Sequence, residues 1–147
     1  MKPVLQALVL AERVYQEKSG KMIICGTFTG LRFMKKLPVK EVELPDGSKQ
    51  MHIPGGMQGG APCAYISVTD VCQNTTLRVQ FSNLTKNLTL FGTDVTINCN
   101  DRLRTVEMAL PLPLLPIGEP GTYALEVLCD GELLGFWRIK AEELNLE

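Results

Sequence analysis

Side chains that carry catalysis or hold metals are scarce in this chain. It has one histidine, His52, no C-x-x-C pair among its five cysteines and no Asp-x-Asp loop. A zinc site needs several closely spaced Cys or His ligands, and a calcium loop needs clustered carboxylates, so the sequence predicts neither. We therefore expect no metal site and no cofactor.

A nucleophilic enzyme is not indicated either, because a nucleophile needs a base beside it. Ser48 and Cys63 flank His52, but neither spacing matches a known nucleophile motif. The glycine-rich residues 55–60 precede an expected strand and lack the Gly-Lys-Ser/Thr of a phosphate-binding loop. We expect a non-enzymatic protein and keep a hydrolase that uses His52 as the catalytic alternative.

Excess charge of one sign is also missing. Fifteen Lys and Arg balance sixteen Asp and Glu, which leaves a net charge of −1. No strong field attracts nucleic acid or an anionic membrane, so we expect neither as a partner. The aromatic side chains that might stack on bases are expected in the core, and they are Phe28, Phe33, Tyr65, Phe81 and Phe91.

Long apolar runs are absent. No segment reaches the roughly 18 apolar residues of a membrane span. The apolar start, Val4 to Ala11, is short and has no convincing signal cleavage site. The cysteines are spread through apparent strands, which predicts reduced, buried thiols and a cytoplasmic protein; they are Cys25, Cys63, Cys72, Cys99 and Cys129.

What the chain does have is strand-like patterning. Apolar and polar residues alternate in 76–81 and 95–99, as in strands that have one solvent-exposed face. Val4 to Gln16 also fits a helical stripe, but its Val, Leu and Tyr content and the turn at Lys18 to Gly20 favour a strand paired with Lys21 to Phe28. We predict an all-β fold, an antiparallel β-sandwich of about eight strands, immunoglobulin-like or C2-like.

The 147 residues suffice for one domain, so we expect a single domain over 1–147. Residues 33–62 are different in composition, because glycine and proline dominate them. We expect a long loop there, or a small hairpin over 39–53 that turns at Pro45-Asp46-Gly47.

The best-specified element is a hairpin from Gly121 to Lys140, which turns at Asp130-Gly131, a preferred type I′ pair. A two-residue turn predicts four cross-strand pairs: Cys129 with Glu132, Val127 with Leu134, Leu125 with Phe136, and Tyr123 with Arg138. Leu125, Val127, Leu134 and Phe136 would then face the core.

The opposite face of this hairpin would carry a second apolar set, which consists of Ala124, Leu128, Leu133, Trp137 and Ile139. A soluble monomer seldom leaves such a patch uncovered. Either residues 33–62 cover it, or Trp137, Leu128, Leu133 and Ile139 form an interface with a protein partner or a second copy of the chain. We expect a binding or protein-interaction module.

A second class of function is the binding of a carbohydrate or another small polar ligand. The strand faces expected to be exposed to solvent carry Arg78, Thr96, Asn98 and Asn100. Other sandwich folds bind carbohydrates or small polar ligands on such faces. The polar run Asn98 to Asp101 also suits a strand that ends in a turn.

Several local patterns coincide with one family. They are the opening run Ala7 to Tyr15, Gly20-Lys21, Gly26-Thr27-Phe28, Ala64 to Val68, and Pro120 to Val127 with Asp130-Gly131. The chain thereby resembles an uncharacterised family of short bacterial single-domain β-sandwich proteins. The resemblance implies a bacterial β-sandwich and no catalytic residue.

Overall fold

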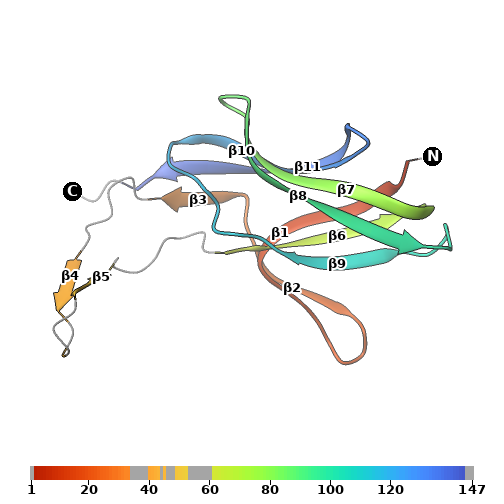
Figure 1. Cartoon of the computed structure of the whole chain (residues 1–147), viewed down its shortest axis with the longest axis horizontal. Helices are drawn as coiled ribbons and strands as arrows, with labels where there is room; N and C mark the ends of the chain where they lie inside the picture. The colour runs from red at the N-terminus through yellow and green to blue at the C-terminus, as the bar shows by residue number, and fades with distance from the viewer. Residues whose placement is uncertain (1, 34–39, 44, 46–48, 53–60, 145–147) are drawn as a thin grey trace.

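The computed structural model describes residues 2–33, 40–43, 45, 49–52 and 61–144, with the backbone alone at 40–43 and 49–52. All regular elements in these ranges are strands (Figure 1). They are β1 (Val4–Gln16), β2 (Met22–Thr27), β3 (Gly30–Phe33), β4 (Lys40–Glu43), β5 (Lys49–His52), β6 (Cys63–Thr69), β7 (Gln73–Asn83), β8 (Leu88–Cys99), β9 (Val106–Pro111), β10 (Gly121–Cys129) and β11 (Glu132–Glu143).

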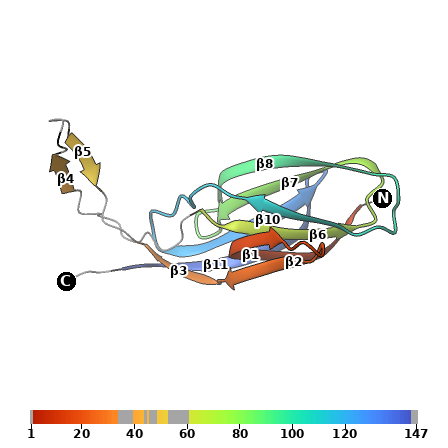
Figure 2. The same cartoon turned by 90° about the horizontal axis from the view of Figure 1, so that it is seen from below.

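Two sheets pack face to face (Figure 2). The first sheet has the order β2-β1-β6-β9, and the second has the order β3-β11-β10-β7-β8. All pairs in them are antiparallel except β11 with β3, which is parallel. The predicted all-β sandwich is therefore confirmed.

The strand count differs from the expected eight. Residues 88–99 form one long strand, β8, and the short strand β3 was not anticipated. β3 has only four residues and pairs with a strand more than 100 positions away, so no local turn signals it.

β4 and β5 pair with each other as a separate two-stranded sheet. Their register, Lys40 opposite His52 and Glu43 opposite Lys49, is the one expected for a hairpin over 39–53. The remaining predictions about residues 33–62, including a cover over the Trp137 face, lie mostly outside the described residues.

The core lies between the two sheets. Its largest fully buried side chains come from both layers: Leu10, Ile66, Val68, Val71, Leu77, Val79, Phe81, Tyr123, Leu125, Val127 and Ile139. The ring of Phe81 stacks between those of Phe91 and Tyr123, with centroid distances of 5.6 Å to each. Phe33 is buried too, and Phe28 packs against the core, so the expected core role is confirmed for these four phenylalanines. It is wrong for Tyr65, which alternates with the buried Ala64 and Ile66 and bonds its hydroxyl to Glu107 outside the core.

The alternation expected in β7 and β8 is confirmed. Leu77, Val79 and Phe81 are buried, while Thr76 and Arg78 are exposed and Gln80 is half-buried. The same period places Ile97 and Cys99 of β8 inside.

The register expected for the hairpin β10–β11 is wrong beyond its first pair. Asp130 and Gly131 do take positive φ, 51° and 78°, and Cys129 does lie opposite Glu132. A β-bulge between Val127 and Leu128 then shifts every later pair by one residue, so that Val127 faces Gly135.

The shift changes which side chains point inward on β11. Leu125 is opposite Trp137, and Tyr123 is opposite Ile139. Phe136, expected in the core, is 47% exposed on the outer side. Because strand side chains alternate, one extra residue exchanges the two faces of β11.

The cysteine prediction holds in part. All five thiols are free, and Cys99 and Cys129 are buried. Cys25 and Cys72 are exposed, contrary to expectation, and Cys63 is half-buried. Cys25 lies in β2, which pairs with β1 alone among the strands of the described residues. Among the described residues, no helix is long and apolar enough to cross a membrane.

Candidate functional site on the outer face of β10 and β11

The structure divides the four residues expected at the interface. Ile139 is fully buried in the core, and Trp137 packs against the core from the inner side. Leu128 and Leu133 remain on the outer face, where they are directly opposite each other. The bulge is the reason, because it turns Trp137 and Ile139 inward while leaving the residues next to the turn in place.

Trp137 is held where the chain crosses between the sheets. Its indole Nε1 donates a 2.9 Å hydrogen bond to the carbonyl oxygen of Phe28, in the link between β2 and β3. A buried tryptophan needs a partner for its single donor, and this crossing supplies one. Residues of the same chain, at the link between β2 and β3, therefore cover Trp137.

Phe136 joins Leu128 and Leu133 on the outer face. We call these three residues the outer patch. Leu133 is 45% exposed and Phe136 47% exposed, while Leu128 is half-buried. The guanidinium carbon of Arg138 lies 4.7 Å from the centroid of the Phe136 ring, a cation–π contact on the surface.

Charged and polar groups border the outer patch on the side of β7. Glu126 lies opposite Phe136, and its carboxylate accepts a 3.2 Å hydrogen bond from the side-chain amide of Gln80. Arg78 lies opposite Leu128 and pairs with Asp94 on β8 at 3.3 Å. The patch thus has an apolar centre and a rim of both charge signs.

Three residues of the carbohydrate alternative, Arg78, Thr96 and Asn98, are exposed on the outer face of β7 and β8, whereas Asn100 follows the end of β8. Asp94, Thr96 and Asn98 alternate along the outer side of β8. Their neighbours on β7 already engage part of the set, because the hydroxyls of Thr76 and Thr96 are 3.1 Å apart and Arg78 holds Asp94. Pairing within the strip leaves fewer groups to bind a sugar.

The polar run that ends β8 forms a turn. Asp101 accepts the backbone N–H of Leu103 at its Oδ1 and that of Arg104 at its carbonyl oxygen, at 3.0 and 3.1 Å. These hydrogen bonds form the turn that ends the strand. The sequence of Asn98 to Asp101 suggested such a turn as the alternative to a ligand site.

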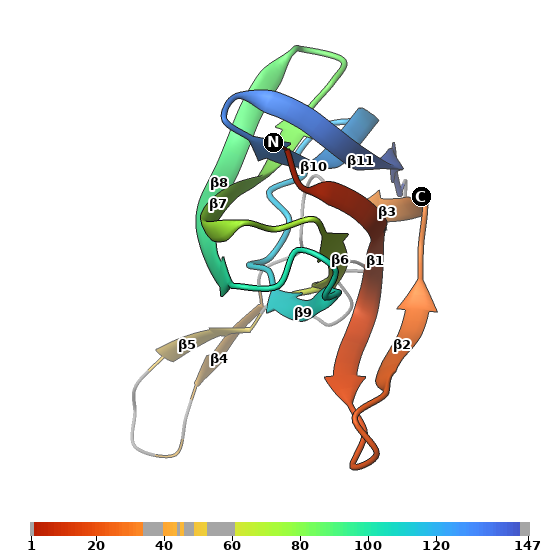
Figure 3. The ribbon, with the colours of Figure 1, turned by 90° about the vertical axis from the view of Figure 1, so that its right-hand side faces the viewer.

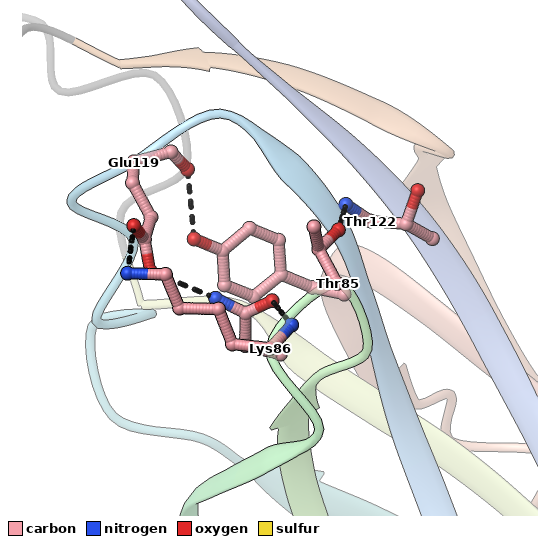
Figure 4. A network of polar contacts seen from close by, with 6 residues as sticks. Thr85, Lys86, Glu119 and Thr122 are labelled. Atoms are coloured by element: carbon pink, nitrogen blue, oxygen red, sulfur yellow. Dashed lines mark hydrogen bonds and ion pairs between the residues drawn. The ribbon is translucent and has the colours of Figure 1, made fainter.

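Sequence reasoning missed a polar network at the other end of the second sheet (Figure 4). Tyr123, 1% exposed, donates a 2.7 Å hydrogen bond from its hydroxyl to the carbonyl oxygen of Glu119. Asn83, 2% exposed, donates from its amide to the Glu119 carboxylate at 3.0 Å. The other carboxylate oxygen pairs with the ammonium of Lys86 at 2.7 Å.

This network joins the turn after β7 to the corner before β10. Thr122 donates its backbone N–H to the hydroxyl of Thr85 at 3.0 Å, and Leu84 donates its own to the carbonyl of Thr122 at 2.8 Å. A tyrosine at the start of a strand, bonded to backbone a few residues upstream, is the tyrosine corner of β-sandwich domains. Only Tyr123 behind Pro120-Gly121 signals it in the sequence.

The electrostatics of the network favour the neutral phenol and the charged amine. Burial, and then the negative charge of Glu119, raise the pKa of Tyr123. The hydrogen bond and charge of Glu119 raise the pKa of Lys86. The side chains of Asn83, Thr85, Lys86, Glu119 and Tyr123 all take part in hydrogen bonds or ion pairs that join the turn after β7 to the corner before β10, so we assign the network a structural role.

The structure adds no geometric support for the hydrolase alternative. His52 lies in β5, where its side chain is outside the described residues, as is Ser48. Burial raises the pKa of the Cys63 thiol, which lowers its thiolate fraction, although backbone hydrogen bonds from Val14 and Ala64 oppose the shift. Within the described residues no three Cys, His, Asp or Glu gather as metal ligands would.

No protein-family model matches the chain, and no curated protein matches it.

Proposed function

We propose that this protein is a non-enzymatic β-sandwich interaction module that binds another protein through the outer patch. The observation that carries the proposal is the exposure of Leu133 and Phe136, each close to half, beside Leu128 on a regular hairpin. Apolar side chains gathered on one rigid surface are typical of interaction sites.

The patch is preorganised for binding. Its residues stand on two long strands that pair with each other and, through β10, with β7. Binding to such a surface requires little ordering of backbone, which leaves more of the contact energy for affinity. An aromatic centre with a polar rim is also the usual anatomy of a protein interface.

The chemistry of the outer patch indicates which kind of partner surface it would bind. Phe136 and Leu133 match an apolar depression, while Arg138 and Glu126 lie at the rim with opposite charges. The partner is therefore a folded protein surface with an apolar centre and neighbouring charges of both signs. Self-association through Trp137 and Ile139 is not proposed, because both side chains point inward.

The test is affinity capture from the source cells with the full chain and matched serine variants. Leu133→Ser and Phe136→Ser remove the outer patch, and Leu103→Ser changes a leucine that is 77% exposed elsewhere. We expect a protein that the wild type and the Leu103→Ser variant retain and both patch variants lose. If no captured protein depends on Leu133 and Phe136, the proposal is wrong.

A further inference from the structure

The outer face of the second sheet carries basic side chains beyond the outer patch. Side chains alternate along a strand, so Arg138 and Lys140 of β11 share the face of Phe136. On β3, which lies beside the end of β11 (Figure 3), Arg32 precedes the buried Phe33 and so points to the same outer side. All three basic side chains are exposed. The outer face therefore has an apolar end near the hairpin turn and a basic end near β3.

A pocket of about 430 Å³ opens at the basic end, between β3 and β11. It is lined by Thr29, Gly30, Leu31, Arg32, Lys140 and Glu142. Gly30 lies opposite Lys140 in the parallel ladder, and it has no side chain to fill the space beside the lysine. Glycine at this position thus leaves the ammonium of Lys140 accessible from the side of β3.

The charges around the pocket favour an anion. Glu142 is the one acid among the described residues that line it, and its carboxylate lies 3.7 Å from the ammonium of Lys140. The two side chains are 57% and 75% exposed, so this ion pair is weak and Lys140 can take a second partner. Arg32 and Arg138 add two further positive charges on the same face. Within the described part of this end, three cations face one carboxylate, which leaves an excess of positive charge.

One segment of a partner can reach both ends of this face. Phe136 and Lys140 are four residues apart on one strand, a distance of about 13 Å at the rise of a β-strand. An extended segment of about five residues covers that distance. Glu126 lies opposite Phe136, so a carboxylate of the partner would meet a like charge at the apolar end and opposite charges at the basic end. The distribution of charge thus gives the partner one direction along β11.

We propose that the partner of the outer patch places a carboxylate, from an aspartate or glutamate of the same surface segment, in the pocket between β3 and β11. The carboxylate contacts the ammonium of Lys140 and the guanidinium of Arg32, while apolar side chains of the partner contact Leu133 and Phe136. This inference rests on the proposed function, because it concerns the same partner and the same face. Complementary charge at one end fixes the orientation of the partner and disfavours a segment with a basic group there.

Selection from a phage-displayed library of random peptides, about 12 residues long, on the immobilised full chain supplies the probe. We expect the enriched peptides to combine apolar side chains with an Asp or Glu about four residues away. A synthetic peptide of an enriched sequence is then titrated against each variant. Lys140→Glu should weaken its binding by about tenfold or more, because the carboxylate then meets a like charge. Lys18→Glu makes the same change in the exposed turn after β1 and, as the matched control, should bind like the wild type.

Exchange of the charges gives the sharpest result. A peptide in which lysine replaces the acidic residue should bind Lys140→Glu more tightly than it binds the wild type. Phe136→Ser should weaken binding of the original peptide too. Thermal unfolding of each variant verifies that the sandwich is intact.

Three results overturn the inference. A peptide that needs Phe136 but binds Lys140→Glu as well as the wild type overturns it and leaves the proposed function standing. A peptide that needs Lys140 but not Phe136 overturns it, because the two ends then do not bind one segment. If no peptide is enriched, or neither substitution weakens the enriched one, the inference also fails, and the capture experiment alone decides the proposed function.

Discussion

The indole of Trp137 donates its hydrogen bond to the carbonyl of Phe28, 109 residues earlier in the chain. The bond connects the inner side of β11 to the point where the chain passes from one sheet to the other. One contact thus fixes the register of the C-terminal hairpin against the N-terminal half of the sandwich. It also explains why this tryptophan is not an interface anchor.

Replacement of Trp137 by phenylalanine should lower the free energy of unfolding by about 1 to 3 kcal/mol, because the Phe28 carbonyl loses its donor and the smaller ring leaves space. Urea denaturation measures the change. Phe136→Leu on the neighbouring, exposed position is the control and should shift stability by about 0.5 kcal/mol or less. Equal losses at the two positions would contradict the inward placement of Trp137.

A side chain at Gly135 would require Leu5 to move. A Cβ there would lie 2.5 Å from Cδ2 of Leu5, which is half-buried and packs against the core. Because this atom is the end of a flexible side chain, Gly135→Ala is expected to destabilise the protein by about 1 kcal/mol, the lower end of the range for overpacking. Combination with Leu5→Val should recover part of the loss, which a double-mutant cycle measures.

The matched control for that cycle is Gly118→Ala, since nothing lies within 4 Å of a Cβ at Gly118. We expect it to be close to neutral. A cycle with no coupling between positions 5 and 135 would show that the bulge does not place Gly135 beneath Leu5.

Loss of the Tyr123 hydroxyl should weaken the hydrogen-bonded attachment of the corner before β10 to the start of that strand. Tyr123→Phe removes the 2.7 Å bond to the Glu119 carbonyl and should cost about 1 kcal/mol or somewhat more. Tyr15→Phe, on an exposed side chain, is the control and should leave stability unchanged. Chemical denaturation of the two variants distinguishes these outcomes.

Stability should also fall at alkaline pH. The pKa values of Tyr123 and Lys86 are raised in the folded protein, the first mainly by burial and the second by its hydrogen bond to Glu119. A raised folded pKa gives a contribution that is complete below the unfolded value, about 10 for both groups, and is lost as the pH rises toward the folded value. Unfolding free energies measured from pH 8 to about pH 11 should therefore decline near the top of the range, less steeply for Tyr123→Phe.

Thiol reactivity should follow the observed exposure. Cys25 and Cys72 are exposed and should react first with an aromatic disulfide reagent, whereas Cys99 and Cys129 should react only as the protein opens. Burial raises the pKa of Cys129, which slows it further. Cys25→Ser and Cys72→Ser should each remove one fast-reacting thiol, and a rapid phase that both variants retain in full would refute this order.

Local sequence was sufficient for most of the strands, although not for β3, and for one turn. The period of two in β7 and β8 identified inward residues such as Leu77 and Val79, because alternate side chains of a strand point to opposite faces. Asp130-Gly131 identified the hairpin because few other residue pairs adopt two positive φ angles in succession.

Tertiary structure decided which face of β11 is buried, and with it the candidate site. The bulge at Val127 and Leu128 places Gly135 beneath Leu5 of the other sheet and turns Trp137 toward Phe28. Those partners come from β1 and from the crossing between the sheets, more than 100 residues away, and no local pattern encodes them. The sequence by itself determined that this protein is a β-sandwich with an apolar hairpin; packing between the sheets selected Phe136, rather than Trp137, for the surface.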